Sequence, residues 1–161
     1  MHPNVGRVVD AAAAAGLSIE VRRFPEGTRT AADAARAVGC EVGQIVKSLV
    51  FVDGDQPVVA LVSGANRVDL AKLAEAAGGG AVRRADGDEV RRLTGFAIGG
   101  VPPFAHATPA IVLVDRDLAQ HDTVWAAAGL PDAVFPIGPA DLVRVSGGTV
   151  ADLAESAPTA S

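Results

Sequence analysis

QIVKSLVFVDGDQPVVALVS, residues 44–63, is the stretch that decides the fold of this chain. It contains two runs rich in β-branched residues, 46–53 and 57–63, on either side of Asp53-Gly54-Asp55. Two such runs joined by a short Asp-Gly turn are typical of a β-hairpin. Because its first two long strands pair as a hairpin, we expect a mixed sheet and not a regular doubly wound parallel one.

Helix and strand patterns alternate along the rest of the chain. Apolar spacing and capping residues predict helices over residues 3–15, 30–38, 68–77, 87–93 and 139–144. Short alternating or β-branched runs predict strands over residues 17–23, 81–84, 110–115, 123–128 and 133–137. Turn residues predict a turn over residues 25–28. The expected fold class is therefore α/β.

Length and composition narrow the function classes. We expect the 161 residues to form a single compact domain over residues 1–155, followed by a disordered tail over 156–161. The net charge of −5 argues against a protein that coats nucleic acid or is held to anionic lipid by charge. One cysteine and three histidines lack metal-ligand spacing, and no apolar run could span a membrane. With no leader pattern and a single cysteine, we expect a cytoplasmic protein without a metal.

Lysine is rare in this chain. Of the 14 basic residues, only Lys47 and Lys72 are lysines. These are the two positions at which the chain has lysine and not the arginine that it uses elsewhere. Alternation along the predicted strand places Lys47 on the same face as Leu49 and Phe51. A lysine on an apolar face needs a partner or a cavity. The alternative is an edge lysine whose stem packs and whose ammonium lies in water.

A second candidate segment is TGFAIGGVPPFAH, residues 94–106. Its glycines allow close approach to a ligand, its prolines stiffen the turn, and its N–H groups could bind an oxyanion. A purely structural turn is the alternative. His106 could act as a general base or serve as a hydrogen-bonded spacer. Cys40 could be a nucleophile only in an electropositive setting, and its neighbour Glu41 favours a small buried hydrophobe instead.

The order of these segments resembles the YbaK/EbsC family of aminoacyl-tRNA deacylases, which includes ProX-like proteins. This family is related to the editing domain inserted in bacterial prolyl-tRNA synthetases. The resemblance covers roughly residues 3–155. It depends on the lysine segment and the Gly-Gly loop together with three further signatures: VDLAKL at 68–73, Asp115, and PADL at 139–142.

The resemblance implies a fold, an activity and partners. The implied fold is a compact domain with a mixed, barrel-like sheet flanked by helices. The implied activity is hydrolysis of the ester that joins a wrong, small amino acid, such as Cys, Ala or a Pro-like one, to the 3′ end of a tRNA. No cofactor is implied. Implied partners are the aminoacyl-tRNA end and an aminoacyl-tRNA synthetase, for a protein that is a monomer or a homodimer. The alternative is a non-catalytic module that binds tRNA ends or a protein.

The resemblance also assigns site residues. Lys47 and Gly100 fall on the catalytic lysine and the backbone-donor loop, with water or a group of the substrate as nucleophile. Substrate-binding positions fall on Phe24, Ser48, Ser63, Gly99, Val101, Pro103, His106 and Gly129. The chain departs from the family pattern at Ala105, where many members have glycine. It also lacks, within residues 126–129, the hydroxyl residue of the cysteine-directed members. Both departures bear on amino-acid specificity.

Arginine pairs at 22–23, 83–84 and 91–92 could contact RNA. The alternative for each pair is a solvated strand or helix face.

Overall fold

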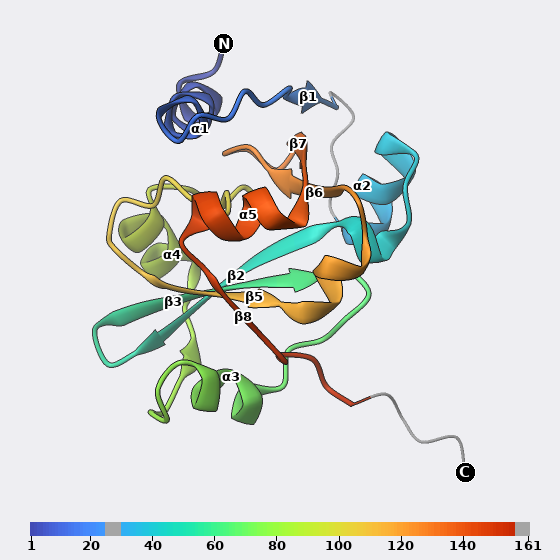
Figure 1. The fold of residues 1–161 in the computed structure, drawn as a ribbon. Helices are drawn as coiled ribbons and strands as arrows, with labels where there is room; N and C mark the ends of the chain where they lie inside the picture. Colours follow the sequence, from blue (N-terminus) through green and yellow to red (C-terminus); the bar gives the residue numbers. More distant parts are fainter. Residues whose placement is uncertain (25–29, 157–161) are drawn as a thin grey trace.

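The predicted hairpin lies at the centre of the computed structural model, which describes residues 1–24 and 30–156 (Figure 1). Strands β2 (Val46–Asp53) and β3 (Gln56–Ser63) pair antiparallel over their whole length. Gly54 opens the two-residue turn between them at φ 60°, a left-handed conformation that glycine adopts without a steric penalty. The hairpin prediction is confirmed.

The hairpin belongs to a five-stranded sheet of order β4-β2-β3-β5-β8. Strand β4 (Arg83–Arg84) runs antiparallel to β2, whereas β5 (Ile111–Asp115) runs parallel to β3 and β8 (Thr149–Ala151) runs parallel to β5. The expected mixed sheet in a single α/β domain is therefore confirmed.

A second, three-stranded sheet contains β1 (Arg22–Arg23), β7 (Ala133–Ile137) and β6 (Val124–Ala127), paired antiparallel in that order. A parallel bridge between Ile45 and Trp125 joins it to the start of β2. The barrel-like sheet that the resemblance implies is thus formed by two sheets that meet at β2 and β6.

Five α-helices and two 3₁₀ helices accompany the sheets in the described residues. On one face of the larger sheet, Leu73 of α3 (Leu70–Ala76) packs against Phe51 and Leu113. Figure 1 shows α4 and α5 on the opposite side, with α1 beyond them beside the small sheet. The remaining helices have these bounds: α1 Pro3–Ala14, α2 Ala31–Val38, η1 Val42–Gln44, α4 Gly87–Thr94, η2 Arg116–Gln120 and α5 Pro139–Ser146.

Three parts of the chain differ from the strand predictions. The strand expected over residues 81–84 is reduced to Arg83–Arg84, which pair with Val52 and Phe51. The strand expected over residues 17–23 is reduced to Arg22–Arg23, because β7 offers only a two-residue pairing there, although the preceding apolar side chains still pack on the core. Strand β8 was not predicted, and pairing with β5 creates it. The turn predicted at residues 25–28 lies outside the described residues, as does all but the first residue of the predicted tail.

Gly129 joins the β6–β7 turn to helix α1. Its φ is 97°, and a Cβ added there would lie 2.7 Å from the Asn4 carbonyl oxygen. In return, the Asn4 side-chain amide donates to the Gly129 carbonyl at 3.3 Å. Gly129 therefore has a packing role, although the resemblance placed it among the substrate contacts.

We predict that Gly129→Ala lowers the free energy of unfolding by about 3 kcal/mol, because it adds backbone overlap to left-handed strain. Gly147→Ala is the matched control, since Gly147 has φ 70° but no atom within 4 Å of an added Cβ. It should cost only about 1 kcal/mol. Urea unfolding measures both, and equal losses would show that the contact with α1 contributes nothing.

Candidate active site

A cavity of about 310 Å³ opens at an unpaired part of the β2 edge. One edge of β2 pairs with β3 throughout. Among the described residues, the other edge pairs only at its two ends, where Ile45 bridges Trp125 and where Phe51 and Val52 face β4. The cavity occupies the gap between these contacts. Its walls include Ala31 and Ala34 of α2, Val46, Ser48 and Val50 of β2, and Val90, Ile98, Gly99, Val101, Pro131 and Val134.

Among the described residues, the main chain of β2 faces this cavity with polar groups that no neighbouring strand pairs. The Val50 carbonyl accepts from the Ala85 N–H at 3.0 Å, on the edge away from β3. The Ile45 carbonyl accepts from the Gly64 N–H at 2.7 Å, on the β3 side. Because backbone groups alternate between the two edges, the N–H and C=O of Ser48 point to the same edge as those of Val50. The cavity wall therefore presents a main-chain donor and a main-chain acceptor.

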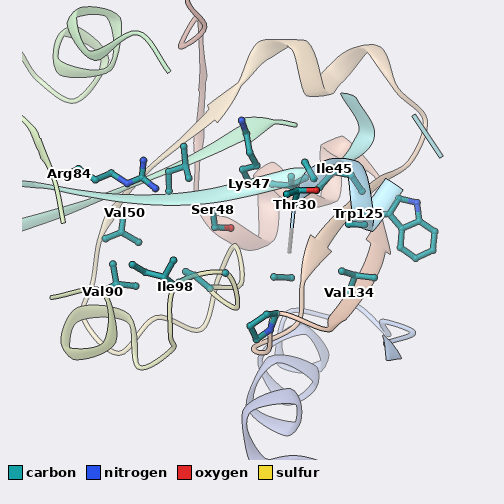
Figure 2. Close-up of a pocket in the computed structure, with 18 residues that line it drawn as sticks. Thr30, Ile45, Lys47, Ser48, Val50, Arg84, Val90, Ile98, Trp125 and Val134 are labelled. Atoms are coloured by element: carbon teal, nitrogen blue, oxygen red, sulfur yellow. The ribbon is translucent and has the colours of Figure 1, made fainter. Parts of the chain in front are cut away.

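Ser48 adds a side-chain hydroxyl to the same wall. Figure 2 shows Ser48 and Val50 on one side of β2, directed toward Val90 and Ile98. The Ser48 Oγ is buried and meets no hydrogen-bond partner in the part of the chain that the structure describes. A buried hydroxyl without a partner costs about 1–3 kcal/mol, and a polar ligand group would remove that cost. Ser48 is therefore suited to contact a ligand.

Lys47 extends from the opposite side of the strand (Figure 2). Lys47 is among the residues that line the cavity, but its Nζ donates to the Asn66 carbonyl at 2.6 Å. Leu49 packs with the cluster around Phe51, as the predicted alternation requires. Burial lowers the pKa of Lys47, and the nearby Arg67 and Arg84 guanidiniums lower it further, while Asp115 acts in the opposite sense.

Asp115 organises the loop that holds the Lys47 ammonium. Its side chain is only 1% exposed, and its carboxylate accepts from the Ser63 N–H, the Asn66 side-chain amide and the Asp117 N–H, at 2.8–3.1 Å. Ser63 has no free group for a substrate, because its hydroxyl donates to the Gly43 carbonyl at 2.7 Å. Asp115 thus positions Asn66, and the Asn66 carbonyl positions Lys47.

The glycine loop faces β2 across the cavity. Gly99, at φ 88°, and Val101 line the cavity, whereas the Gly100 N–H donates to the Ala97 carbonyl at 3.0 Å. Pro102 and Pro103 have no N–H to offer. Within the described residues, the N–H groups of Gly99 and Val101 meet no main-chain acceptor outside helices and strands. Among residues 99–101, the donors left for a ligand in the described part of the chain are therefore the N–H groups of Gly99 and Val101, and not that of Gly100.

His106 stabilises the glycine loop through a hydrogen bond to its main chain. Its Nε2 lies 2.7 Å from the Pro102 carbonyl oxygen, and burial lowers its pKa, which favours a neutral ring that donates to this carbonyl. The neighbouring Ala105 has φ 68°, the left-handed region that a glycine would adopt without strain. His106 does not line the cavity, so this geometry agrees with the hydrogen-bonded spacer that the sequence left open.

The remaining predicted residues lie near the cavity without lining it. Phe24 packs in the cluster of Trp125 and Val134, which do line it. Cys40 lies outside the lining, and burial and Glu41 raise its pKa, which disfavours a thiolate. Sequence reasoning placed Thr30 only at the start of the helix predicted over residues 30–38. It missed Ile98 and Pro131 as cavity walls, because nothing in their spacing marks them.

Among the described residues, no group of three or more His, Cys, Asp or Glu side chains could hold a metal ion. Likewise, no helix there has the length and apolar character to cross a membrane.

We predict that Asp115→Ala lowers the free energy of unfolding by about 3 kcal/mol, because it leaves the Ser63 and Asp117 N–H groups without their acceptor and removes one of the two acceptors of the Asn66 amide. Asp141→Ala is the matched control, since it removes a carboxylate from an exposed pair with Arg144. It should cost less than about 1 kcal/mol. Chemical denaturation measures both, and a small loss for Asp115→Ala would mean that water replaces this carboxylate as the acceptor.

The chain is similar in sequence and in fold to known proteins. The family described as "Aminoacyl-tRNA editing domain" matches residues 25–145. A solved structure described as "a putative trans-editing enzyme for prolyl tRNA synthetase" has 49% sequence identity and a TM-score of 0.92, over 97% of this chain and 99% of that one.

Two curated relatives extend the comparison. The Enterococcus faecalis protein named "Putative Cys-tRNA(Pro)/Cys-tRNA(Cys) deacylase EbsC" is 27% identical over 131 residues, 81% of this chain and 80% of that protein. The proline–tRNA ligase of Maridesulfovibrio salexigens is 30% identical over 105 residues, 63% of this chain but 17% of the ligase. The match to the family model spans most of the chain, so this protein belongs to the aminoacyl-tRNA editing domain family.

Proposed function

We propose that this protein is a trans-editing hydrolase that removes a small, wrongly attached amino acid from the 3′ end of a tRNA. The observation that supports this most is the cavity between the open β2 edge and the Gly99–Val101 loop. It combines a buried Ser48 hydroxyl without a partner, free main-chain groups and apolar walls. A ligand that suits this site has an apolar side chain beside several polar acceptors and donors, as an aminoacyl ester has.

The reaction needs a stabilised oxyanion. Water attacks the ester carbonyl carbon, the carbonyl oxygen becomes an oxyanion, and the bond to the ribose oxygen then breaks as that oxygen takes up a proton. The N–H groups of Gly99 and Val101 are the donors available for the oxyanion. One such donor typically contributes about 3–4 kcal/mol of transition-state stabilisation. Because the ester is already activated, this contribution suffices without a serine or cysteine nucleophile.

The cavity walls favour a small amino acid. The side chains of Ala31, Ala34 and Val46 line one part of the cavity. Binding energy alone separates amino acids that differ by one methylene only 10- to 200-fold, which is why a second, size-selective site is needed for accuracy. A substrate side chain the size of Ala, Cys, Ser or Pro fits this requirement.

Lys47 contributes positive charge beside the cavity and does not point into it. Its Nζ lies against the Asn66 carbonyl on the other side of β2, where it can bind the terminal nucleotide of the tRNA while the ester enters the cavity. Ser48 therefore acts inside the cavity, whereas Lys47 acts beside it.

We predict that Ser48→Ala leaves the free energy of unfolding unchanged or slightly raised, because the hydroxyl has no protein partner to lose. The same change lowers kcat/KM for deacylation at least about fivefold, since a hydrogen bond to the substrate contributes roughly 1 kcal/mol. Ser63→Ala is the control, because its hydroxyl is bonded to Gly43 and its loss costs about 1 kcal/mol of stability. A stability loss in Ser48→Ala without a loss of activity would contradict this role.

The decisive experiment is a deacylation screen over tRNAs charged with Ala, Cys, Ser and Pro, with Lys47→Ala beside the natural protein. We expect hydrolysis of at least one species and at least a tenfold loss in the variant, about 1.4 kcal/mol of transition-state stabilisation. Binding without hydrolysis of any species would favour the non-catalytic module instead.

Activity should also depend on the charge of Lys47 at alkaline pH. The ammonium is present below its pKa, and burial lowers that pKa from the ordinary value of 10.5. The enzymatic rate, after subtraction of spontaneous ester hydrolysis, should therefore fall as pH rises, at a pH below that of an ordinary lysine. In Lys47→Arg this decline should disappear and the rate should be low throughout, because guanidinium stays charged but is bulkier. An identical alkaline decline in both proteins would contradict the role of Lys47.

A further inference from the structure

In two of the arginine pairs, one arginine forms an ion pair and its neighbour stacks on an aromatic ring. Arg23 pairs with Asp132 at 3.2 Å, and Arg83 bonds Glu89 through both guanidinium nitrogens at 2.7 and 2.8 Å. Their neighbours instead stack on aromatic rings. The Arg22 guanidinium lies 4.9 Å from the Trp125 ring centre, and the Arg84 guanidinium lies 5.7 Å from the Phe51 ring centre. Among the described residues, one member of each of these two pairs meets a carboxylate and the other does not.

The stacked arginines flank the cavity. Arg84 and Trp125 both line it, and Figure 2 shows them toward opposite ends of the labelled residues, with Lys47 between. Arg67 follows Asn66, which holds the Lys47 ammonium. We call Arg22, Arg67 and Arg84 the arginine rim. The third arginine pair, Arg91 and Arg92, is exposed on α4 and does not line the cavity.

The arginine rim carries positive charge that the described residues leave uncompensated. None of its three members meets a carboxylate within ion-pair distance in the described part of the chain, although the whole protein has a net charge of −5. Arg67 and Arg84 both lower the pKa of Lys47, so these cations repel one another. Bringing like charges together costs free energy, and a bound anion offsets that cost.

Phosphate is the anion that fits best. Stacking on a ring orients a guanidinium and leaves the N–H groups at its edge free, and this planar fork binds phosphate oxygens in pairs. Several exposed cations spread around a cavity suit a chain of phosphates and not a single ion. A single RNA strand whose last residue enters the cavity would lay its backbone over such a rim.

We propose that the arginine rim binds the phosphates of the single-stranded 3′ end of the tRNA, so that the rim and Lys47 hold the strand while the cavity holds the aminoacyl ester. This inference rests on the proposed function. It assigns the contact to one member of each pair, Arg22 and Arg84, and gives no role in RNA binding to Arg23 or Arg83.

The test measures binding of an uncharged acceptor-stem RNA hairpin, labelled with a fluorophore, by fluorescence anisotropy at several salt concentrations. A hairpin without the single-stranded 3′ end is the RNA control. The variants are Arg22→Gln, Arg67→Gln, Arg84→Gln and their triple combination. Arg23→Gln and Arg83→Gln are the matched controls, since each removes an adjacent arginine of equal charge. Thermal unfolding confirms that every variant is folded.

We expect each rim variant to weaken binding about fivefold and to reduce the slope of log K against log salt by roughly 0.7, the value for one phosphate contact on a single strand. The controls should stay within about twofold, because their charges are already paired. The hairpin without a 3′ end should bind weakly and equally to all variants. Equal losses in the rim and control variants, or no binding by the natural protein, would overturn the proposal.

Deacylation of the same variants separates this inference from the proposed function. Rim-dependent RNA binding without hydrolysis of any charged tRNA would refute the hydrolase and leave the rim intact. Hydrolysis with KM unchanged in the triple variant would refute the rim and leave the hydrolase intact. If both hold, KM should rise in the rim variants while kcat changes little, because the rim does not touch the ester.

Discussion

The open part of the β2 edge is the constraint on which the site depends. An unpaired strand edge exposes main-chain donors and acceptors, and most proteins cover such an edge. Here the neighbours of β2 contact it at two separate places, through Ile45 at its start and through β4 at its end. The distance between those contacts determines the width of the gap. The cavity, the free groups of Ser48 and the loop across from them all follow from it.

The alternation of side chains along β2 separates the two functions proposed for this edge. Because successive side chains point to opposite faces, Lys47 and Ser48 cannot project into the same space. Ser48 shares its side with apolar cavity walls, whereas Lys47 shares its side with Leu49 and with the Phe51 ring on which Arg84 stacks. One side is therefore suited to an amino-acid side chain and its ester, and the other to an anionic strand.

The sequence predicted the parts of this arrangement that are local. Alternation and an Asp-Gly turn were enough for the hairpin and for the face of Lys47, and apolar spacing with capping residues was enough for the helix that follows Thr30. It did not predict the open edge, because that edge depends on where strands of two and four residues pair. The acceptor for Lys47 is a main-chain carbonyl, which no residue type marks. Likewise, no residue type indicates that the Gly100 N–H is bonded within a turn, because this depends only on the geometry of the loop.

The difference between what the sequence shows and where the fold places single residues also explains why the net charge of the chain says little about its partner. A net charge of −5 describes the whole surface, but recognition of a strand end needs only a few cations in the right place. In this fold, acidic residues neutralise Arg23 and Arg83, while aromatic rings hold Arg22 and Arg84 beside the cavity without neutralising them. A ring orients a guanidinium without neutralising it, so its charge stays available. Stacking in place of ion pairing is thus how an acidic protein can keep a small cationic surface at one site.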